Sequence, residues 1–111
     1  MPALSGLREK DFAPLFYITL AVMEKTFYFR VSGLVQGVWF RQSAREQAML
    51  LNITGWVTNL PDGKVEGRAT GDEAMLETFR TWLNHGPVAA TVLKLEWEES
   101  ELQHYDGFVI R

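Results

Sequence analysis

The segment 26–52, TFYFRVSGLVQGVWFRQSAREQAMLLN, decides the fold, because it joins a strand pattern, a glycine loop and a helix pattern without a break. In residues 26–33 apolar side chains alternate with polar ones, which is typical of a half-buried strand. In residues 40–52 the apolar residues recur at helical spacing, on one face that holds Phe40, Ala44, Ala48 and Leu51. The sequence therefore predicts a strand that leads through a short loop directly into a helix.

A hairpin follows this unit. Residues 53–59 are rich in β-branched and aromatic side chains, and residues 64–70 alternate again. Between them lies LPDG, residues 60–63, in which Pro61 fixes φ and Gly63 is free to take a positive φ. This arrangement predicts two antiparallel strands joined by a tight turn.

A second helix and a further strand complete the chain. Asp72 has the position and chemistry of an N-cap, and the glycine and proline at 86–87 end the helix. Its apolar stripe consists of Met75, Leu76, Phe79, Trp82 and Leu83. Residues 90–99 then alternate as a strand, with one side formed by Thr91, Leu93, Leu95 and Trp97. Residues 108–111 are consistent with a short last strand.

The resulting order, β-α-β-β-α-β, predicts an α+β ferredoxin-like sandwich in which an antiparallel sheet carries both helices on one face. A strand, a crossover helix and a second strand in the same sheet leave the two strands parallel. The first two strands therefore end at the same edge of the sheet. This places the glycine loop after the first strand and Asn59, at the end of the second, on one rim.

The loop itself has the chemistry of an anion site. Residues 33–41 contain no proline, so every residue keeps a backbone N–H donor, and the two glycines allow these groups to converge. The loop leads into a helix N-terminus, which favours an anion, and Arg41 in the first turn can grip phosphate oxygens bidentately. Taken alone, however, the loop fits a tight turn with a solvated arginine better than it fits a phosphate site.

Composition limits the class of protein. The chain has 111 residues, 47% of them hydrophobic and 23% charged, which fits one globular domain. It contains no cysteine, which excludes disulfides, thiolate metal sites and a cysteine nucleophile. A net charge of −3 does not favour a large nucleic-acid surface.

Two motifs together resemble the acylphosphatase family. The first is VSGLVQGVWFR, residues 31–41, and the second is GWVTNLPDGKVE, residues 55–66. A third stretch, HGPVAATV at 85–92, is similar to the family's passage into its fourth strand. The resemblance covers residues 24–111, which are interpreted as one acylphosphatase-like domain, and Trp39 stands at a variable position of the first motif.

The resemblance implies metal-independent hydrolysis of acyl phosphates to a carboxylate and inorganic phosphate, without a cofactor. Phosphate would be bound by Arg41 and by the backbone amides of the loop, that is by Gln36, Gly37, Val38, Trp39, Phe40 and Arg41. The catalytic residues would be Arg41 and Asn59, the latter orienting the attacking water. Small acyl phosphates would be the partners of a cytoplasmic monomer that binds neither nucleic acid nor membranes.

One alternative stays open, namely a non-catalytic module on the same fold that binds a phosphorylated ligand or another protein. Intact Arg41 and Asn59 favour the enzyme, since a pure binder needs no amide to orient water. Residues 1–23 are interpreted separately as an N-terminal extension, either an appended element, a flexible tail or the product of an upstream start codon before Met23. Their apolar run is too short to span a bilayer and lacks a clear signal-peptide cleavage site.

Overall fold

The computed structural model describes residues 23–111, so the interpretation of the N-terminal extension lies, apart from Met23, outside the described residues. The elements follow in the order β1 (Glu24–Leu34), α2 (Phe40–Leu50), β2 (Thr54–Asn59), β3 (Val65–Asp72), α3 (Glu73–Leu83), β4 (Thr91–Ser100) and β5 (Phe108–Ile110). Neither described helix is long and apolar enough to cross a membrane.

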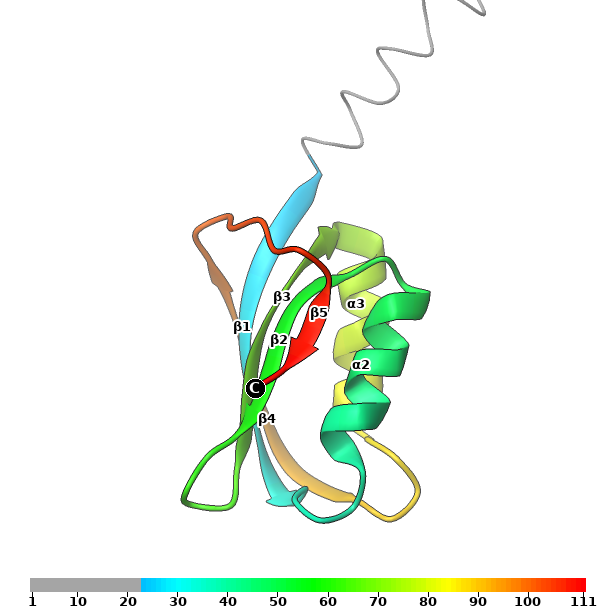
Figure 1. Cartoon of the computed structure of the whole chain (residues 1–111), viewed down its shortest axis with the longest axis vertical. Coiled ribbons are helices and arrows are strands. Elements are labelled where there is room, and N and C mark those ends of the chain that lie inside the picture. The colour runs from blue at the N-terminus through cyan, green and yellow to red at the C-terminus, as the bar shows by residue number, and fades with distance from the viewer. Residues whose placement is uncertain (1–22) are drawn as a thin grey trace, which may run out of the picture.

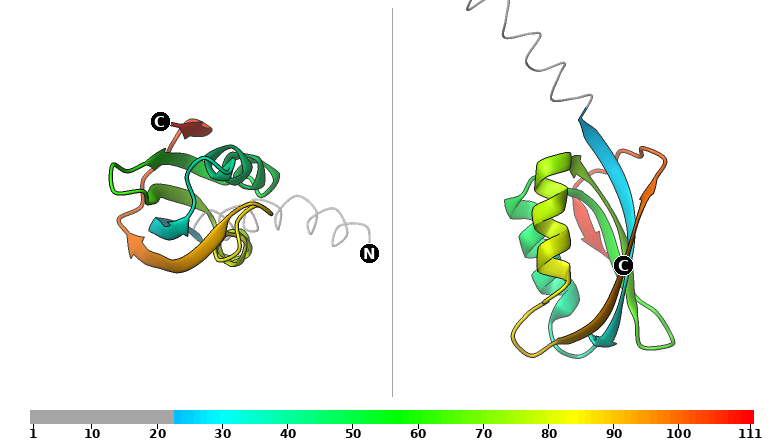
Figure 2. Two further views of the ribbon diagram at one scale, coloured as in Figure 1. Left: turned by 90° about the horizontal axis from the view of Figure 1, so that it is seen from below. Right: turned by 180° about the vertical axis from the view of Figure 1, so that it is seen from behind.

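The molecule has two layers, a twisted sheet and a pair of helices that cover one of its faces (Figures 1 and 2). The strand order is β4-β1-β3-β2-β5. Because β1 and β2 are each antiparallel to β3, they run parallel to one another. The predicted ferredoxin-like sandwich is confirmed, and both the β1–α2 loop and the β2–β3 turn lie at the same end of the sheet (Figure 1).

The short strand β5 extends the predicted sheet in an unpredicted way. It pairs with β2 in parallel, with Phe108 opposite Gly55 and Ile110 opposite Val57. The sheet is therefore mixed, since its other pairings are antiparallel. Phe108 is buried and meets Phe79 edge to face at 6.0 Å between ring centroids, so β5 is anchored in the core.

The core lies between the sheet and the helices and follows the predicted faces. Phe29 and Val31 of β1 are fully buried, as are Ala44 and Ala48 of α2, and Phe40 is 2% exposed. These side chains pack together because alternation places β1 residues 29 and 31 on one side while α2 presents every fourth residue to them. Burial of this apolar surface is the main force that holds α2, and the loop before it, against the sheet.

In α3 the predicted cap and most of the predicted stripe are confirmed. The Asp72 carboxylate accepts a hydrogen bond from the Ala74 backbone N–H at 2.9 Å. Three residues of the stripe are buried and Trp82 packs against them, the buried ones being Leu76, Phe79 and Leu83. Met75 does not belong to the stripe, because its side chain is 38% exposed.

The predicted face of β4 is wrong at Leu93. The pairing with β1 shifts between Ser32 and Gly33, which face Lys94 and Val92, so Leu93 is an extra residue without a partner. This bulge reverses the side-chain alternation. As a result Val92, Leu95 and Trp97 pack against the core, whereas Leu93 is 79% exposed and Thr91 is also exposed.

Candidate active site

A cavity of about 390 Å³ opens at the end of the sheet where β1 and β2 finish. Such a volume is within the usual range for small-molecule sites. The cavity is lined by residues from the β1–α2 loop, the first turn of α2, β2 and β5, namely Val35, Gln36, Gly37, Trp39, Phe40, Arg41, Gln42, Asn59 and Ile110. The predicted glycine loop and Asn59 are therefore brought together at one rim.

The loop turns through two residues with positive φ. Gly37 has φ 75° and Trp39 has φ 66°, while the residues around them return to ordinary backbone. In such a turn successive N–H groups can point to one side and form an anion-binding concavity. No backbone N–H of residues 36–39 donates to a backbone carbonyl within residues 23–111. These donors therefore face the cavity or solvent instead of being used by the fold.

The N-termini of the two helices differ in how they are capped. In α3 the first turn is capped by Asp72 and contains the acidic Glu73. In α2 the N-cap residue is Trp39, which supplies no side-chain hydrogen bond, and the first turn contains no acidic residue. The first intrahelical bond runs from the Ser43 N–H to the Trp39 carbonyl at 3.0 Å. The earlier N–H groups of α2, and its positive dipole end, are thus left for an external anion.

Arg41 is the one residue of the cavity lining with a formal charge. It makes no ion pair with any of the residues 23–111. Arg30, by contrast, is committed to Glu96 through contacts of 2.8 and 3.3 Å. One turn after Arg41, the Arg45 Nε donates to the Phe108 carbonyl at 3.1 Å and ties α2 to β5. The Arg41 guanidinium keeps its whole donor fork for a ligand.

Asn59 contributes an unusual polar atom. It is the last residue of β2, and its Oδ1 is buried yet accepts no hydrogen bond from any described residue. Leaving a buried polar atom without a partner costs free energy, and native proteins rarely do so without a functional reason. Asn59 lines the same cavity as Arg41, so its side-chain amide borders the space in which a ligand would lie.

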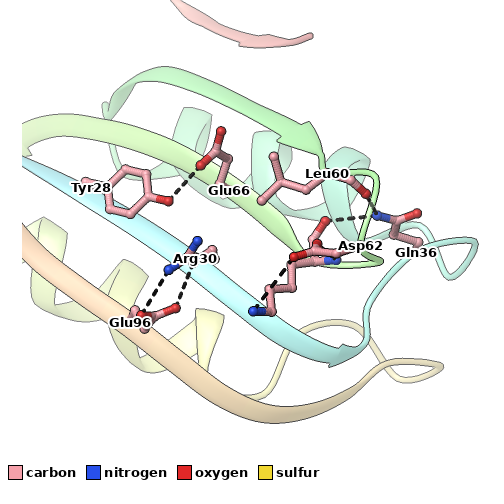
Figure 3. A network of polar contacts seen from close by, with 8 residues as sticks. Tyr28, Arg30, Gln36, Leu60, Asp62, Glu66 and Glu96 are labelled. Atoms are coloured by element: carbon pink, nitrogen blue, oxygen red, sulfur yellow. Dashed lines mark hydrogen bonds and ion pairs between the residues drawn. The ribbon is translucent and has the colours of Figure 1, made fainter.

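Gln36 has a function that the sequence did not reveal. Its Nε2 donates to the Leu60 carbonyl at 2.8 Å and to the Lys64 carbonyl at 2.9 Å. Figure 3 shows this side chain reaching from the β1–α2 loop to the β2–β3 turn. The amide thereby fixes the loop that carries Arg41 to the turn that follows Asn59. For a ligand in the cavity, Gln36 therefore offers its backbone N–H rather than its side-chain nitrogen.

Away from the cavity, the sheet surface carries a polar network (Figure 3). The Tyr28 hydroxyl donates to Glu66 at 2.6 Å, and burial together with this bond raises the Tyr28 pKa to about 12. On the neighbouring pair, the hydrogen bond from Arg30 holds the Glu96 pKa below its ordinary value. These contacts join β1 to β3 and β4, and none of the four residues lines the cavity.

A profile of the acylphosphatase family matches residues 27–110. The chain belongs to the acylphosphatase family. Acylphosphatases are hydrolases that act on acyl phosphates. The family match spans the loop, both helices and all the strands that build the cavity, so the resemblance inferred from the two motifs is confirmed.

Sequence identity and structural similarity to individual acylphosphatases support this assignment. The chain is 43% identical over 81 residues to an acylphosphatase of Nitrosococcus oceani, which covers 73% of this chain and 91% of the relative. It is 46% identical over 81 residues to one from Pseudomonas paraeruginosa, covering 73% and 89%. Among solved structures, an acylphosphatase from Coxiella burnetii superposes with a TM-score of 0.80 at 41% identity, covering 82% of this chain and 96% of that one.

The sequence identified most of the acylphosphatase cavity, although not all of it. Of the predicted phosphate-binding residues, all but Val38 line the cavity; the Val38 side chain packs against the core, and the role of its backbone N–H stays a prediction. The sequence analysis missed Val35, Gln42 and Ile110. Gln42 follows Arg41 directly and could have been included on that ground. Ile110 carries no signal of its own, since only the pairing of β5 with β2 brings it to the rim.

Proposed function

We propose that this acylphosphatase hydrolyses the carboxyl–phosphate bond of small acyl phosphates without a metal ion. In this proposal Arg41 and the backbone N–H groups of residues 36–41 bind the phosphoryl group, and Asn59 orients the attacking water. The observation that carries the proposal is that Asn59, whose Oδ1 is buried without a partner among the described residues, lines the same cavity as Arg41 and the uncapped end of α2. Arg41 and the end of α2 suit an anion, and Asn59 supplies a side-chain amide that can hold a water.

Binding of the phosphoryl group follows from the charges. The group is anionic, whereas the loop offers N–H donors, a helix dipole and one guanidinium without a competing carboxylate in the lining. The phosphoryl oxygens carry negative charge both in the bound substrate and in the transition state, so the same donors contact them in both states. Their fixed orientation in the loop makes them effective, because no solvent has to reorganise during the reaction.

The chemical step needs one further group. An attacking water must lie in line with the bond that breaks, and a hydrogen bond to the Asn59 oxygen holds it there. The leaving group is a carboxylate, whose conjugate acid has a pKa of about 4. Since it departs as a stable anion, no general acid is required. Positioning of the water and stabilisation of charge are therefore sufficient.

The proposal of metal independence is supported by the side chains available. Within residues 23–111 no group of three or more His, Asp or Glu side chains is arranged to hold a metal ion. The lining itself contains no histidine and no carboxylate. Stabilisation of the phosphoryl charge is assigned to Arg41 for this reason.

The two residues can be tested separately because their roles differ. Arg41→Gln should weaken inorganic phosphate binding and lower kcat/KM for benzoyl phosphate by on the order of 10²-fold or more, since it removes a charged contact to the phosphoryl group. Arg41→Lys should rescue poorly, because a point charge cannot reproduce the planar fork. Asn59→Ala should lower kcat by a similar factor while phosphate affinity stays within about twofold of wild type.

Matched controls are available on α3 and at its end. Arg80 pairs only with Glu77 on the same helix among the described residues, and Asn84 donates only to the Arg80 carbonyl. Arg80→Gln and Asn84→Ala should leave phosphate binding and turnover at wild-type values. Wild-type turnover in Asn59→Ala would refute its role in orienting water. A wild-type protein that binds phosphate but hydrolyses no acyl phosphate would instead support the alternative of a non-catalytic binding module.

A further inference from the structure

Trp39 occupies a position that packing does not explain. Its backbone has φ 66° and ψ 23°, in the left-handed region that a bulky side chain rarely adopts. Its side chain is 78% exposed and does not belong to the core or to the residues packed against it. A strained residue whose ring stabilises nothing in the fold points to a function at the site where it is held.

The cavity lining divides into two chemical kinds. Polar side chains come from Gln36, Arg41, Gln42 and Asn59, and the proposed function assigns the phosphoryl group to Arg41 and the water to Asn59. The apolar side chains are Val35, Trp39, Phe40 and Ile110. Val35 and Phe40 are 1% and 2% exposed, so their surface is already used by the core, whereas Trp39 and Ile110 keep 78% and 37% of theirs. Only these last two have apolar surface left for a ligand.

We infer that Trp39 and Ile110 form the acyl subsite, and that this subsite favours acyl phosphates with an aromatic acyl group. The inference rests on the proposed function, which places the phosphoryl group at Arg41 and leaves the acyl group to extend along the remaining lining. A planar ring can stack on the exposed indole and bury apolar area on both partners. A methyl group, as in acetyl phosphate, covers little of the indole face.

The positions of both residues in the fold allow them to select among acyl groups. Trp39 immediately precedes the first turn of α2, which carries Arg41, and Ile110 lies on β5, the strand that pairs with β2 at the edge of the sheet. Neither side chain is required to bind phosphate, since the groups assigned to that task are the backbone amides and the Arg41 guanidinium. Preference for one acyl group over another can therefore change while phosphate chemistry is retained.

The test compares two substrates in each variant, so that the intrinsic reactivity of each substrate cancels. The quantity is kcat/KM for benzoyl phosphate divided by kcat/KM for acetyl phosphate. In Trp39→Gly this ratio should fall by about fivefold, the loss expected for one aromatic stacking contact. Glycine adopts φ 66° without strain, so the change should not unfold the loop. Ile110→Ala should lower the ratio in the same direction by a smaller factor.

Leu50→Ala provides the control, because Leu50 is also 78% exposed on α2 but lies at the opposite end of that helix from the cavity. Its ratio should equal that of wild type. A ratio in Trp39→Gly that stays within about twofold of wild type, with both substrates affected alike, would overturn the inference while leaving the hydrolase activity intact.

A binding measurement separates the inference from the proposed chemistry. Phenacylphosphonate and acetonylphosphonate are the methylene analogues of benzoyl and acetyl phosphate and cannot be hydrolysed at that bond. Calorimetric titration should show that Trp39→Gly lowers the preference for phenacylphosphonate by about fivefold. If wild type binds both analogues but hydrolyses neither acyl phosphate, the proposed function fails, and the ratio of the two dissociation constants still supports or overturns the subsite.

Discussion

Removing the Gln36 side chain should destabilise the protein by more than its half-buried surface position suggests. In Gln36→Ala the Leu60 and Lys64 carbonyls lose donors at 2.8 and 2.9 Å. Each such bond contributes about 1 kcal/mol net, so the free energy of unfolding should drop by about 2 kcal/mol. For a domain of this size that corresponds to a melting temperature lower by about 10 °C.

Gln36→Glu should be worse than alanine at neutral pH. It would place a carboxylate against two carbonyl oxygens, which are acceptors and cannot stabilise the charge. Since the same two bonds fix the loop to the turn after Asn59, kcat for benzoyl phosphate should fall in both variants. The loss should be larger for kcat than for phosphate affinity, because loosening of the loop misplaces Arg41 relative to the water.

Thermal unfolding measured by circular dichroism, beside a benzoyl phosphate assay, checks this prediction. Gln42→Ala is the stability control, because Gln42 makes only an exposed bond of 3.4 Å to Glu46. Its melting temperature should change by no more than about 3 °C. If Gln36→Ala were no less stable than Gln42→Ala, the side chain would not be holding the two halves of the cavity together.

Three further predictions concern metal, ligand and pH. Dialysis against a chelator should leave acyl phosphate hydrolysis unchanged, and activity lost on dialysis and restored by one divalent ion would refute the metal-free mechanism. Inorganic phosphate at ten times its Kd should stabilise the folded protein by about 1.4 kcal/mol in thermal unfolding, and no rise beyond that in an ionic-strength-matched chloride solution would count against the anion site. Glu96→Gln should lower the urea midpoint of unfolding at pH 7. Because Arg30 holds the Glu96 pKa below 4.5, the difference between variant and wild type should be complete above pH 4.5 and should vanish as the pH falls through the lowered pKa. An equal difference in urea midpoint at both ends of this pH range would contradict the prediction.

The sequence predicted best where one local rule acted alone. Phe29 and Val31 alternate on a straight strand, Ala44 and Ala48 recur at helical spacing, and Asp72 caps its helix through its own side chain. In each case the determining neighbour is within four residues along the chain. Arg41 and Asn59 could be placed on one rim because the direction of two strands joined by a crossover helix is fixed by topology.

Three of the failures involve partners distant in sequence. Leu93 turns outward because β4 carries one residue more than β1 at the bulge, and an alternating pattern does not reveal such an offset. Ile110 reaches the cavity only through the parallel pairing of β5. The two hydrogen bonds from Gln36 connect residues more than twenty positions apart, and the sequence of a loop glutamine does not indicate which carbonyls its side chain will bind. Local sequence pattern therefore predicted which faces of the helices and strands are buried, whereas the strand register and the hydrogen-bond partners of side chains required the structure.

The bulge in β4 also bears on how molecules of this protein meet one another. The described sheet ends in β4 on one side and in β5 on the other, and an unpaired strand edge is a template for aggregation. On β4 the extra residue Leu93 interrupts the regular ladder, and exposed charges at Lys94, Glu98 and Glu99 follow it. On the opposite side β5 presents only three residues. The bulge and the charges protect the β4 edge and β5 is short, so edge-to-edge growth into fibrils is disfavoured, and deletion of Leu93 would remove one of these protections.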